Sequence, residues 1–68
     1  MQGSIENFFK VFDEAKRKYD NIRFTSSYVT YWRLTLEINN KTVFDLRGNE
    51  TNSVFDNAAH KLFEYMRK

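Results

Sequence analysis

The segment Tyr28-Val29-Thr30-Tyr31-Trp32-Arg33-Leu34-Thr35-Leu36-Glu37-Ile38 decides the fold, because two kinds of side chain alternate along it. Its even positions carry Tyr, Thr, Trp, Leu, Leu and Ile, whereas its odd positions carry Val, Tyr, Arg, Thr and Glu. A period of two is typical of a β-strand with one face on a core and the other half wet. Asn39-Asn40-Lys41 then turns the chain, so Tyr28–Gly48 predicts a β-hairpin.

The register of this hairpin depends on the length of its turn. A two-residue loop, Asn39-Asn40, would pair Leu34 with Asp45 and place charged residues on the apolar face. A three-residue loop, Asn39–Lys41, avoids this, and burial selects it because a slip of one residue exchanges the two faces. The pairs it predicts are Ile38 with Thr42, Leu36 with Phe44 and Leu34 with Leu46. We expect left-handed backbone geometry near Asn40-Lys41.

Apolar residues at helical spacing predict a helix on each side of the hairpin. The first helix has Ser4 as its N-cap and ends at Asp20-Asn21. Its stripe is Ile5, Phe8, Phe9, Phe12, Ala15 and Tyr19. The second helix begins within Asn49–Ser53, with Asn49, Thr51 or Asn52 as its cap. Its stripe is Val54, Phe55, Ala58, Ala59, Leu62, Tyr65 and Met66, with Phe63 at the edge.

These elements predict one α+β domain over residues 1–68. Asn21–Thr25 can form a short additional strand, with Ser26-Ser27 as its turn into the main strand. The order is therefore α-β-β-β-α, or α-β-β-α without that strand. Each helix has one apolar stripe and the antiparallel sheet has one apolar face, so we expect two layers with both helices on the same face.

Composition narrows the classes of function. The 68 residues carry a net charge of +2, no cysteine and one histidine, so we expect neither a disulfide nor a metal site, and no cofactor. No secretory signal or apolar run of membrane-spanning length is present, which predicts a cytoplasmic protein without membrane contact. Abundant Asn, Lys and Phe without proline are typical of an AT-rich genome and suggest a bacterial, phage or plasmid origin.

Three features lie within Leu34–Phe63: the turn Ile38-Asn39-Asn40-Lys41-Thr42, Gly48 before the last helix, and Ala58-Ala59 followed by Lys61-Leu62 in that helix. They resemble the second hairpin turn, the glycine before the last helix and the alanine-rich packing segment of the double-stranded RNA-binding domain. The resemblance implies helix, three antiparallel strands and helix, with both helices on one sheet face. It does not extend to the RNA contacts, because Asn49–Val54 lacks the lysine cluster that opens the family's last helix. Ser26-Ser27-Tyr28, which we expect to be the first loop, lacks that loop's histidine.

The sheet face opposite the helices is the leading candidate site. We expect it to be open and to carry aromatic, aliphatic and guanidinium groups, which suit a protein interface or stacking of single-stranded bases. The predicted contact residues are Val29, Tyr31, Arg33, Val43 and Arg47. The edge of the hairpin offers a second route, by strand addition.

Basic residues at the helix C-termini form a second candidate site. They are Lys16, Arg17, Lys18, Arg67 and Lys68, and they gather at one pole if the helices run parallel. Such a pole attracts phosphates, although cations at a helix C-terminus also simply complement the helix dipole. His60 is expected to be a solvated residue on the outer face of its helix rather than a catalytic base.

The resulting hypothesis is a small interaction module without enzymatic activity. It binds a protein partner or a second copy through the open sheet face, as a phage- or plasmid-type accessory or inhibitor protein does. The alternative is a nucleic-acid-binding module that uses the sheet face and the basic helix ends.

Overall fold

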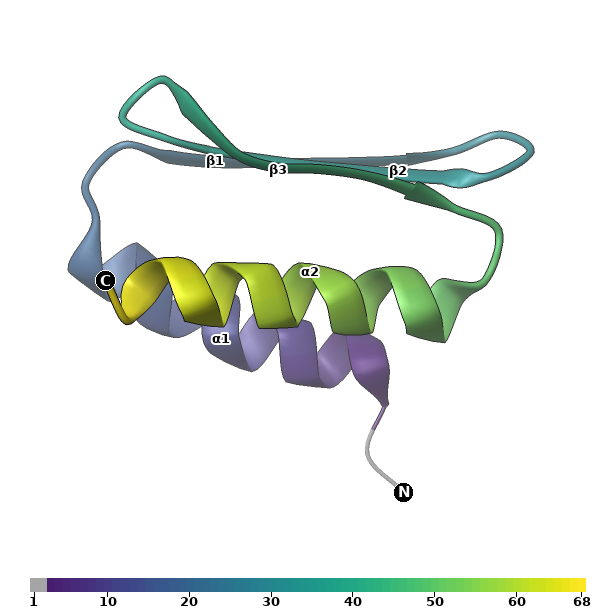
Figure 1. Ribbon diagram of the computed structural model, residues 1–68, viewed down its shortest axis with the longest axis horizontal. Helices are drawn as coiled ribbons and strands as arrows, with labels where there is room; N and C mark the ends of the chain where they lie inside the picture. The colour runs from purple at the N-terminus through teal and green to yellow at the C-terminus, as the bar shows by residue number, and fades with distance from the viewer. Residues whose placement is uncertain (1–2) are drawn as a thin grey trace.

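The computed structural model describes residues 3–68 and shows the order α-β-β-β-α. The elements are α1 (Ser4–Lys18), β1 (Ile22–Tyr28), β2 (Trp32–Ile38), β3 (Lys41–Gly48) and α2 (Thr51–Met66). The strands form one antiparallel sheet in the order β1-β2-β3, and both helices cover the same face of it (Figure 1). The predicted α+β, two-layer architecture is therefore confirmed, and the additional strand β1 is present.

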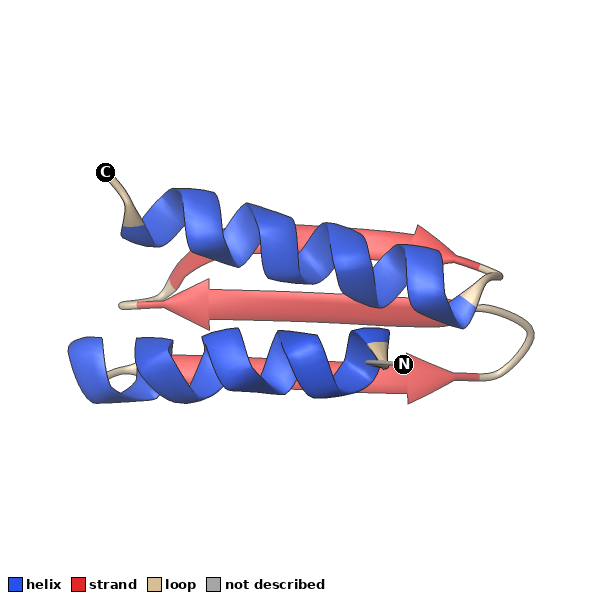
Figure 2. Cartoon of the chain, turned by 90° about the horizontal axis from the view of Figure 1, so that it is seen from below, coloured by secondary structure: helices blue, strands red, loops and turns tan. Residues whose placement is uncertain are grey.

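The two helices run in the same direction beneath the sheet. Figure 2 shows α1 lying along β1, and α2 crossing the neighbouring strands. Both helix C-termini consequently lie at the same end of the molecule as the turn between β2 and β3 (Figures 1 and 2). The loop between β1 and β2 lies at the opposite end. The fold thus has two distinct poles, and each collects a different set of side chains.

Aromatic and aliphatic side chains from α1, β2, β3 and α2 form the buried core, and side chains of β1 pack against it. Phe8, which is fully buried, lies within 6.2 Å, centroid to centroid, of the rings of Phe24, Phe44 and Phe55. This one side chain therefore joins α1 to both edge strands and to α2. The other buried residues are Ala15, Leu34, Leu36, Ile38, Phe44, Val54, Phe55, Ala58, Ala59 and Leu62. The predicted stripe of α2 is confirmed, because Tyr65 and Met66 also pack against this cluster.

The first hairpin differs from the expectation in where it turns. Ser26 and Ser27 lie inside β1, where they pair with Leu34 and Arg33, and the turn instead spans residues 29–31. The predicted turn at Ser26-Ser27 is therefore wrong, as is the start of the main strand at Tyr28. A period of two looks the same in one long strand and in a strand that ends and returns, so the pattern alone did not reveal the loop.

The second hairpin has the two-residue turn of one predicted arrangement and two of the residue pairs of the other. Asn39 and Asn40 have φ angles of 54° and 67°, as a two-residue type I′ turn requires. The predicted three-residue loop is therefore wrong, and Ile38 pairs with Lys41. A register shift beside Leu36 then restores two predicted pairs, Leu36 with Phe44 and Leu34 with Leu46. One β-bulge thus reconciles the asparagine turn with burial of the apolar face.

The helix caps also differ from the expectation. Gly3, not Ser4, is the N-cap of α1, because the helix begins one residue earlier than predicted. Glu50 caps α2, and its Oε1 accepts a hydrogen bond of 2.8 Å from the backbone N–H of Ser53. None of the three predicted caps occupies this position. A carboxylate here satisfies an otherwise unpaired N–H and complements the positive end of the helix dipole.

Candidate interaction surface

The open face of the sheet is polar along its whole length. Its side chains form three cross-strand rows, which are Ser27–Arg33–Arg47, Thr25–Thr35–Asp45 and Arg23–Glu37–Thr42. No apolar side chain lies in these rows. Antiparallel sheets with one wet face commonly have such a composition, so the face by itself does not identify a binding site.

One ion pair organises the open face at its centre. The Arg33 guanidinium donates two hydrogen bonds to the Asp45 carboxylate, at 3.3 Å from Nε and 3.2 Å from Nη2. The hydrogen bond from Arg33 lowers the pKa of Asp45, as do the charges of Arg33 and Arg47. The same bond and the carboxylate charge raise the pKa of Arg33. One carboxylate, that of Asp45, thus lies near two guanidiniums. The pair formed by Arg33 and Arg47 therefore carries one positive charge more than Asp45 neutralises.

Two of the predicted contact residues lie where they were expected. Arg33 and Arg47 are directly opposite each other on the open face. Tyr31 and Val29 are not on that face but in the loop that follows β1, so their predicted placement on a strand is wrong. The loop nevertheless brings Tyr31 next to the arginines. Tyr31 and Arg47 line one shallow hollow of about 300 Å³ with Gly48 and Asn49.

Val43 is the predicted contact residue that the structure separates from the others. It lies at the bulge near the opposite end of β3, is partly buried, and packs against the core. The bulge changes the alternation of side chains between the two faces, which the sequence pattern did not reveal. Val43 therefore does not contribute to an open surface with Tyr31.

We call the remaining four residues, Val29, Tyr31, Arg33 and Arg47, the loop-end surface. Val29 is 84% exposed and Tyr31 is 44% exposed, and of the two Tyr31 is the one that lies beside the guanidiniums. The backbone N–H of Val29 donates a hydrogen bond of 3.4 Å to the carbonyl of Tyr31, which closes the loop. Tyr31, Arg33 and Arg47 are of residue types that are enriched among those carrying most of the binding energy in protein interfaces.

The loop that carries Val29 and Tyr31 is flanked by aromatic residues that pack against each other, which the sequence pattern did not predict. The Tyr28 ring lies 5.1 Å from the Trp32 ring, which in turn lies 5.3 Å from the Phe55 ring in α2. The Trp32 Nε1–H donates a hydrogen bond of 2.9 Å to Thr51 Oγ1. Trp32 therefore anchors one end of the loop to α2, and Tyr28 at the other end packs against Trp32. A loop held in this way loses little conformational freedom on binding.

The basic residues at the helix C-termini gather at the opposite pole, because the helices run parallel. Lys18 Nζ donates a hydrogen bond of 2.9 Å to the carbonyl of Met66, next to Arg67 and Lys68. Lys16 lies 5.5 Å from the centre of the Phe12 ring. Arg17 is exposed on the same turn of α1. Neither contact involves a carboxylate, so both ammonium groups keep their positive charge at this pole.

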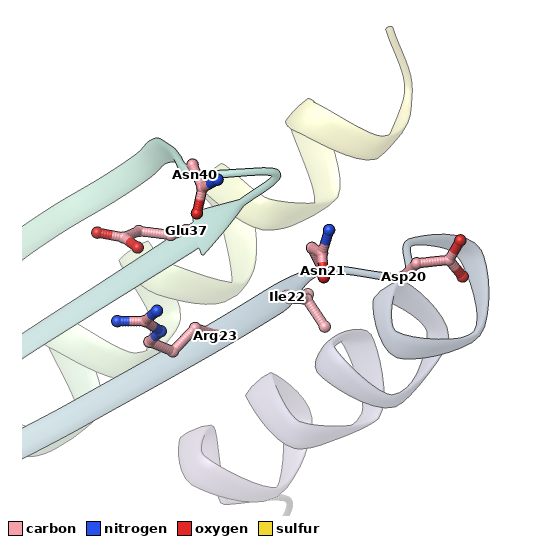
Figure 3. Close-up of a pocket in the computed structure, with 6 residues that line it drawn as sticks. All are labelled: Asp20, Asn21, Ile22, Arg23, Glu37 and Asn40. Atoms are coloured by element: carbon pink, nitrogen blue, oxygen red, sulfur yellow. The ribbon is translucent and has the colours of Figure 1, made fainter.

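A polar hollow of about 250 Å³ lies at the same pole, between the end of α1 and the β2–β3 turn (Figure 3). The backbone N–H of Asn39 donates a hydrogen bond of 2.8 Å to the carbonyl of Asn21, which ties its two sides together. Two carboxylates, one guanidinium, two amides and one aliphatic side chain line it. They are Asp20, Asn21, Ile22, Arg23, Glu37 and Asn40. The excess of one carboxylate does not favour an anion such as phosphate.

The remaining candidate groups are ordinary surface residues. His60 is exposed on α2, and its Nε2 lies 3.1 Å from a Glu64 carboxylate oxygen one turn away. Within residues 3–68, no group of three or more histidine, cysteine or acidic side chains is placed to hold a metal ion. Neither described helix is long and apolar enough to cross a membrane.

Comparisons of the chain with protein-family models, with curated proteins and with solved structures give no match. The resemblance to the double-stranded RNA-binding domain is therefore not tested by them. The order of the elements is the one that the resemblance implies. The start of α2 carries the Glu50 carboxylate, where that family carries lysines.

Proposed function

We propose that this chain is a small interaction module without enzymatic activity, which binds a protein partner through the loop-end surface. The observation that carries the proposal is the exposure of Tyr31 beside Arg33 and Arg47, with Val29 exposed on the same loop. Exposed apolar groups that adjoin each other and are rimmed by polar residues are typical of protein interaction sites. The chemistry is that of a contact surface and not of a reaction centre.

The charges of this surface define the partner further. The Asp45 carboxylate pairs with Arg33, so the Arg47 guanidinium is the one available to bind a carboxylate of the partner. The partner surface that fits therefore has an acidic group beside an apolar patch. Guanidinium–carboxylate pairing gives such a contact geometric specificity as well as affinity.

Affinity capture with matched variants tests this proposal. Tyr31→Ala and Arg47→Glu should each remove captured partners that bind the unmodified chain. Phe63→Ala is the matched control for the first, since Phe63 is 48% exposed on α2, away from this loop. Lys41→Glu is the control for the second, because Lys41 is exposed at the other end of the same strand. If all four variants retain the same partners, the loop-end surface is not the contact.

A second candidate function, binding of nucleic acid, is supported by one separate observation. The parallel helices gather Lys16, Lys18, Arg67 and Lys68 at one pole, and Lys18 bridges the two helix ends. Binding through that pole would weaken steeply with salt, because released counterions supply much of the affinity. A gel-shift series with single- and double-stranded oligonucleotides at low and moderate salt separates the two functions. Absence of any shift at low salt rules out this second candidate.

A further inference from the structure

The two edges of the sheet are built differently. An exposed edge strand invites pairing with another chain, and proteins commonly protect such edges with charges or bulges. The edge strand β3 has both, since it carries Lys41, Asp45 and Arg47 and contains the bulge. The edge strand β1 pairs with β2 in regular register over all of its seven residues, and Arg23 is its only charged residue. The free side of β1 is therefore an unprotected edge.

An apolar strip on α1 lies beside this unprotected edge. Ile5 and Phe9 are 40% and 39% exposed, although both belong to the predicted apolar stripe of the helix. The Phe9 ring lies 5.9 Å from the Phe24 ring in β1, and the Phe12 ring lies 5.6 Å from it. Figure 2 shows α1 lying along β1, so the free backbone groups of β1 and the exposed apolar side chains of α1 belong to neighbouring elements at one edge of the sheet.

We propose that a second copy of this chain covers this side, by antiparallel pairing of β1 with β1 across a two-fold axis at Thr25. The seven-residue strand is complementary to itself about that residue. Phe24 would face Ser26 of the other copy, whose small side chain leaves room for the ring. Ile22 would face Tyr28, and Arg23 would face Ser27. No like charges oppose each other, and the result is one continuous six-stranded sheet.

The same axis also brings the apolar strips of the two helices together. Phe24, which is next to Thr25, contacts Phe9 and Phe12 on the helix-covered side of the sheet, so the axis passes close to these rings. The two copies of α1 would then lie side by side in opposite directions, with Phe9 of each against the other. Strand pairing and apolar burial would therefore reinforce each other in one interface.

The size of this side sets the expected strength of the dimer. Seven strand residues span about 23 Å, and the molecule extends 28 Å in the direction from the sheet to the helices, because its shortest extent of 16 Å runs across the strands (Figure 1). The face is thus on the order of 600 Å² in projection, at the lower end of the roughly 600–1,000 Å² per partner that stable interfaces bury. We expect the dissociation constant of the dimer to lie between about 10 µM and 1 mM. The loop-end surface takes no part in this contact, so the inference is independent of the proposed function.

Cysteine cross-linking tests the position of the axis. The chain has no cysteine, so each single-cysteine variant reports on one position. Directly opposed residues of antiparallel strands have Cα atoms about 4.5–5.5 Å apart, which a disulfide can span. Under mild oxidation, Thr25→Cys should form a linked dimer at least about tenfold faster than the control Thr42→Cys, exposed on β3. Equal rates for the two variants would overturn the proposal.

Charge exchange at the same position provides the second test. Sedimentation equilibrium of the unmodified chain should show the mean mass rising from 8.2 kDa toward twice that value with concentration. Thr25→Lys and Thr25→Glu should each remain monomeric, because like charges then oppose each other at the axis, and an equimolar mixture should dimerise again. Thr42→Lys should behave as the unmodified chain. An unmodified chain that stays monomeric at about 1 mM, or a Thr25→Lys variant that dimerises normally, contradicts the proposal.

Discussion

Trp32 in β2 and Thr51 at the start of α2 are joined by a hydrogen bond of 2.9 Å from the indole Nε1–H to the hydroxyl Oγ1. The bond links the sheet to the second helix beside the loop that carries Tyr31. Thr51→Val keeps the side-chain shape but leaves the half-buried indole N–H unpaired. We expect it to lower the free energy of unfolding by about 1–3 kcal/mol, measured by urea denaturation.

Thr42→Val is the matched control for that measurement, because the Thr42 side chain is exposed on the edge strand β3. Its free energy of unfolding should change by no more than about 0.5 kcal/mol. A Thr51→Val variant as stable as the Thr42→Val variant would show that the hydrogen bond does not stabilise the fold.

Phe8 is the core residue whose loss should be most damaging. It is fully buried and packs against rings from α1, β1, β3 and α2. Phe8→Ala should cost about 3–5 kcal/mol, a large share of the roughly 3–10 kcal/mol expected for a domain of this length. Circular dichroism should show the variant largely unfolded.

Two further variants keep this prediction testable if Phe8→Ala does not fold at all. Phe8→Leu retains most of the buried volume and should remain folded with a clearly reduced melting temperature. Phe63→Ala removes a ring that is 48% exposed and should change the stability by less than about 1 kcal/mol. Equal losses for Phe8→Leu and Phe63→Ala would contradict the central role of Phe8.

In the asparagine turn between β2 and β3, we expect one substitution to keep or raise the stability and another to lower it. Asn39 and Asn40 both have positive φ angles, which a β-branched side chain rarely adopts. Asn40→Gly should leave the stability unchanged or raise it by up to about 1 kcal/mol, since Asn-Gly is the preferred type I′ sequence. Asn40→Val should lower it by about 1–2 kcal/mol. Equal melting temperatures for the two variants would show that the turn does not need this geometry.

The extent to which the sequence predicts this fold differs between its parts. The stripe of α2 and the pairs Leu34–Leu46 and Leu36–Phe44 were predictable, because burial dictates which side chains share a face. The loop after Tyr28 was not, since alternation continues unbroken through a hairpin whose strands keep the same faces. The bulge at Val43 was hidden for a similar reason. The bulge allows the two-residue asparagine turn and the pairing of the apolar residues to occur in the same hairpin. Neither the turn preference nor the burial pattern alone predicts it.

The candidate site was predictable to the same degree. Arg33 and Arg47 were placed correctly, because their positions depend only on register. Tyr31 and Val29 were assigned to the wrong element, but the loop returns Tyr31 to the arginines. The exposure of Phe9 was not predictable, because helical spacing places it in the apolar stripe and only the packing of α1 along β1 leaves it at the edge.

The Arg33–Asp45 ion pair predicts a specific dependence of stability on pH. The folded state lowers the pKa of Asp45 below its ordinary value of about 4. The ion pair therefore contributes fully above that value, and its contribution is lost as the pH falls through the lower pKa of the folded state. Both side chains are well exposed, so the contribution is small and weakens with salt.

Asp45→Asn isolates this contribution. The stability difference between the unmodified chain and the variant, measured by urea denaturation from pH 7 to pH 2, should be constant above about pH 5 and shrink as the pH falls below 4. Added salt should reduce the difference at neutral pH but have little effect on it at pH 2, where the carboxylate is protonated. Glu64→Gln is the matched control, because Glu64 lies in the separate pair with His60 on α2. A difference that is the same at pH 2 and pH 7 would show that the Asp45 charge does not stabilise the sheet.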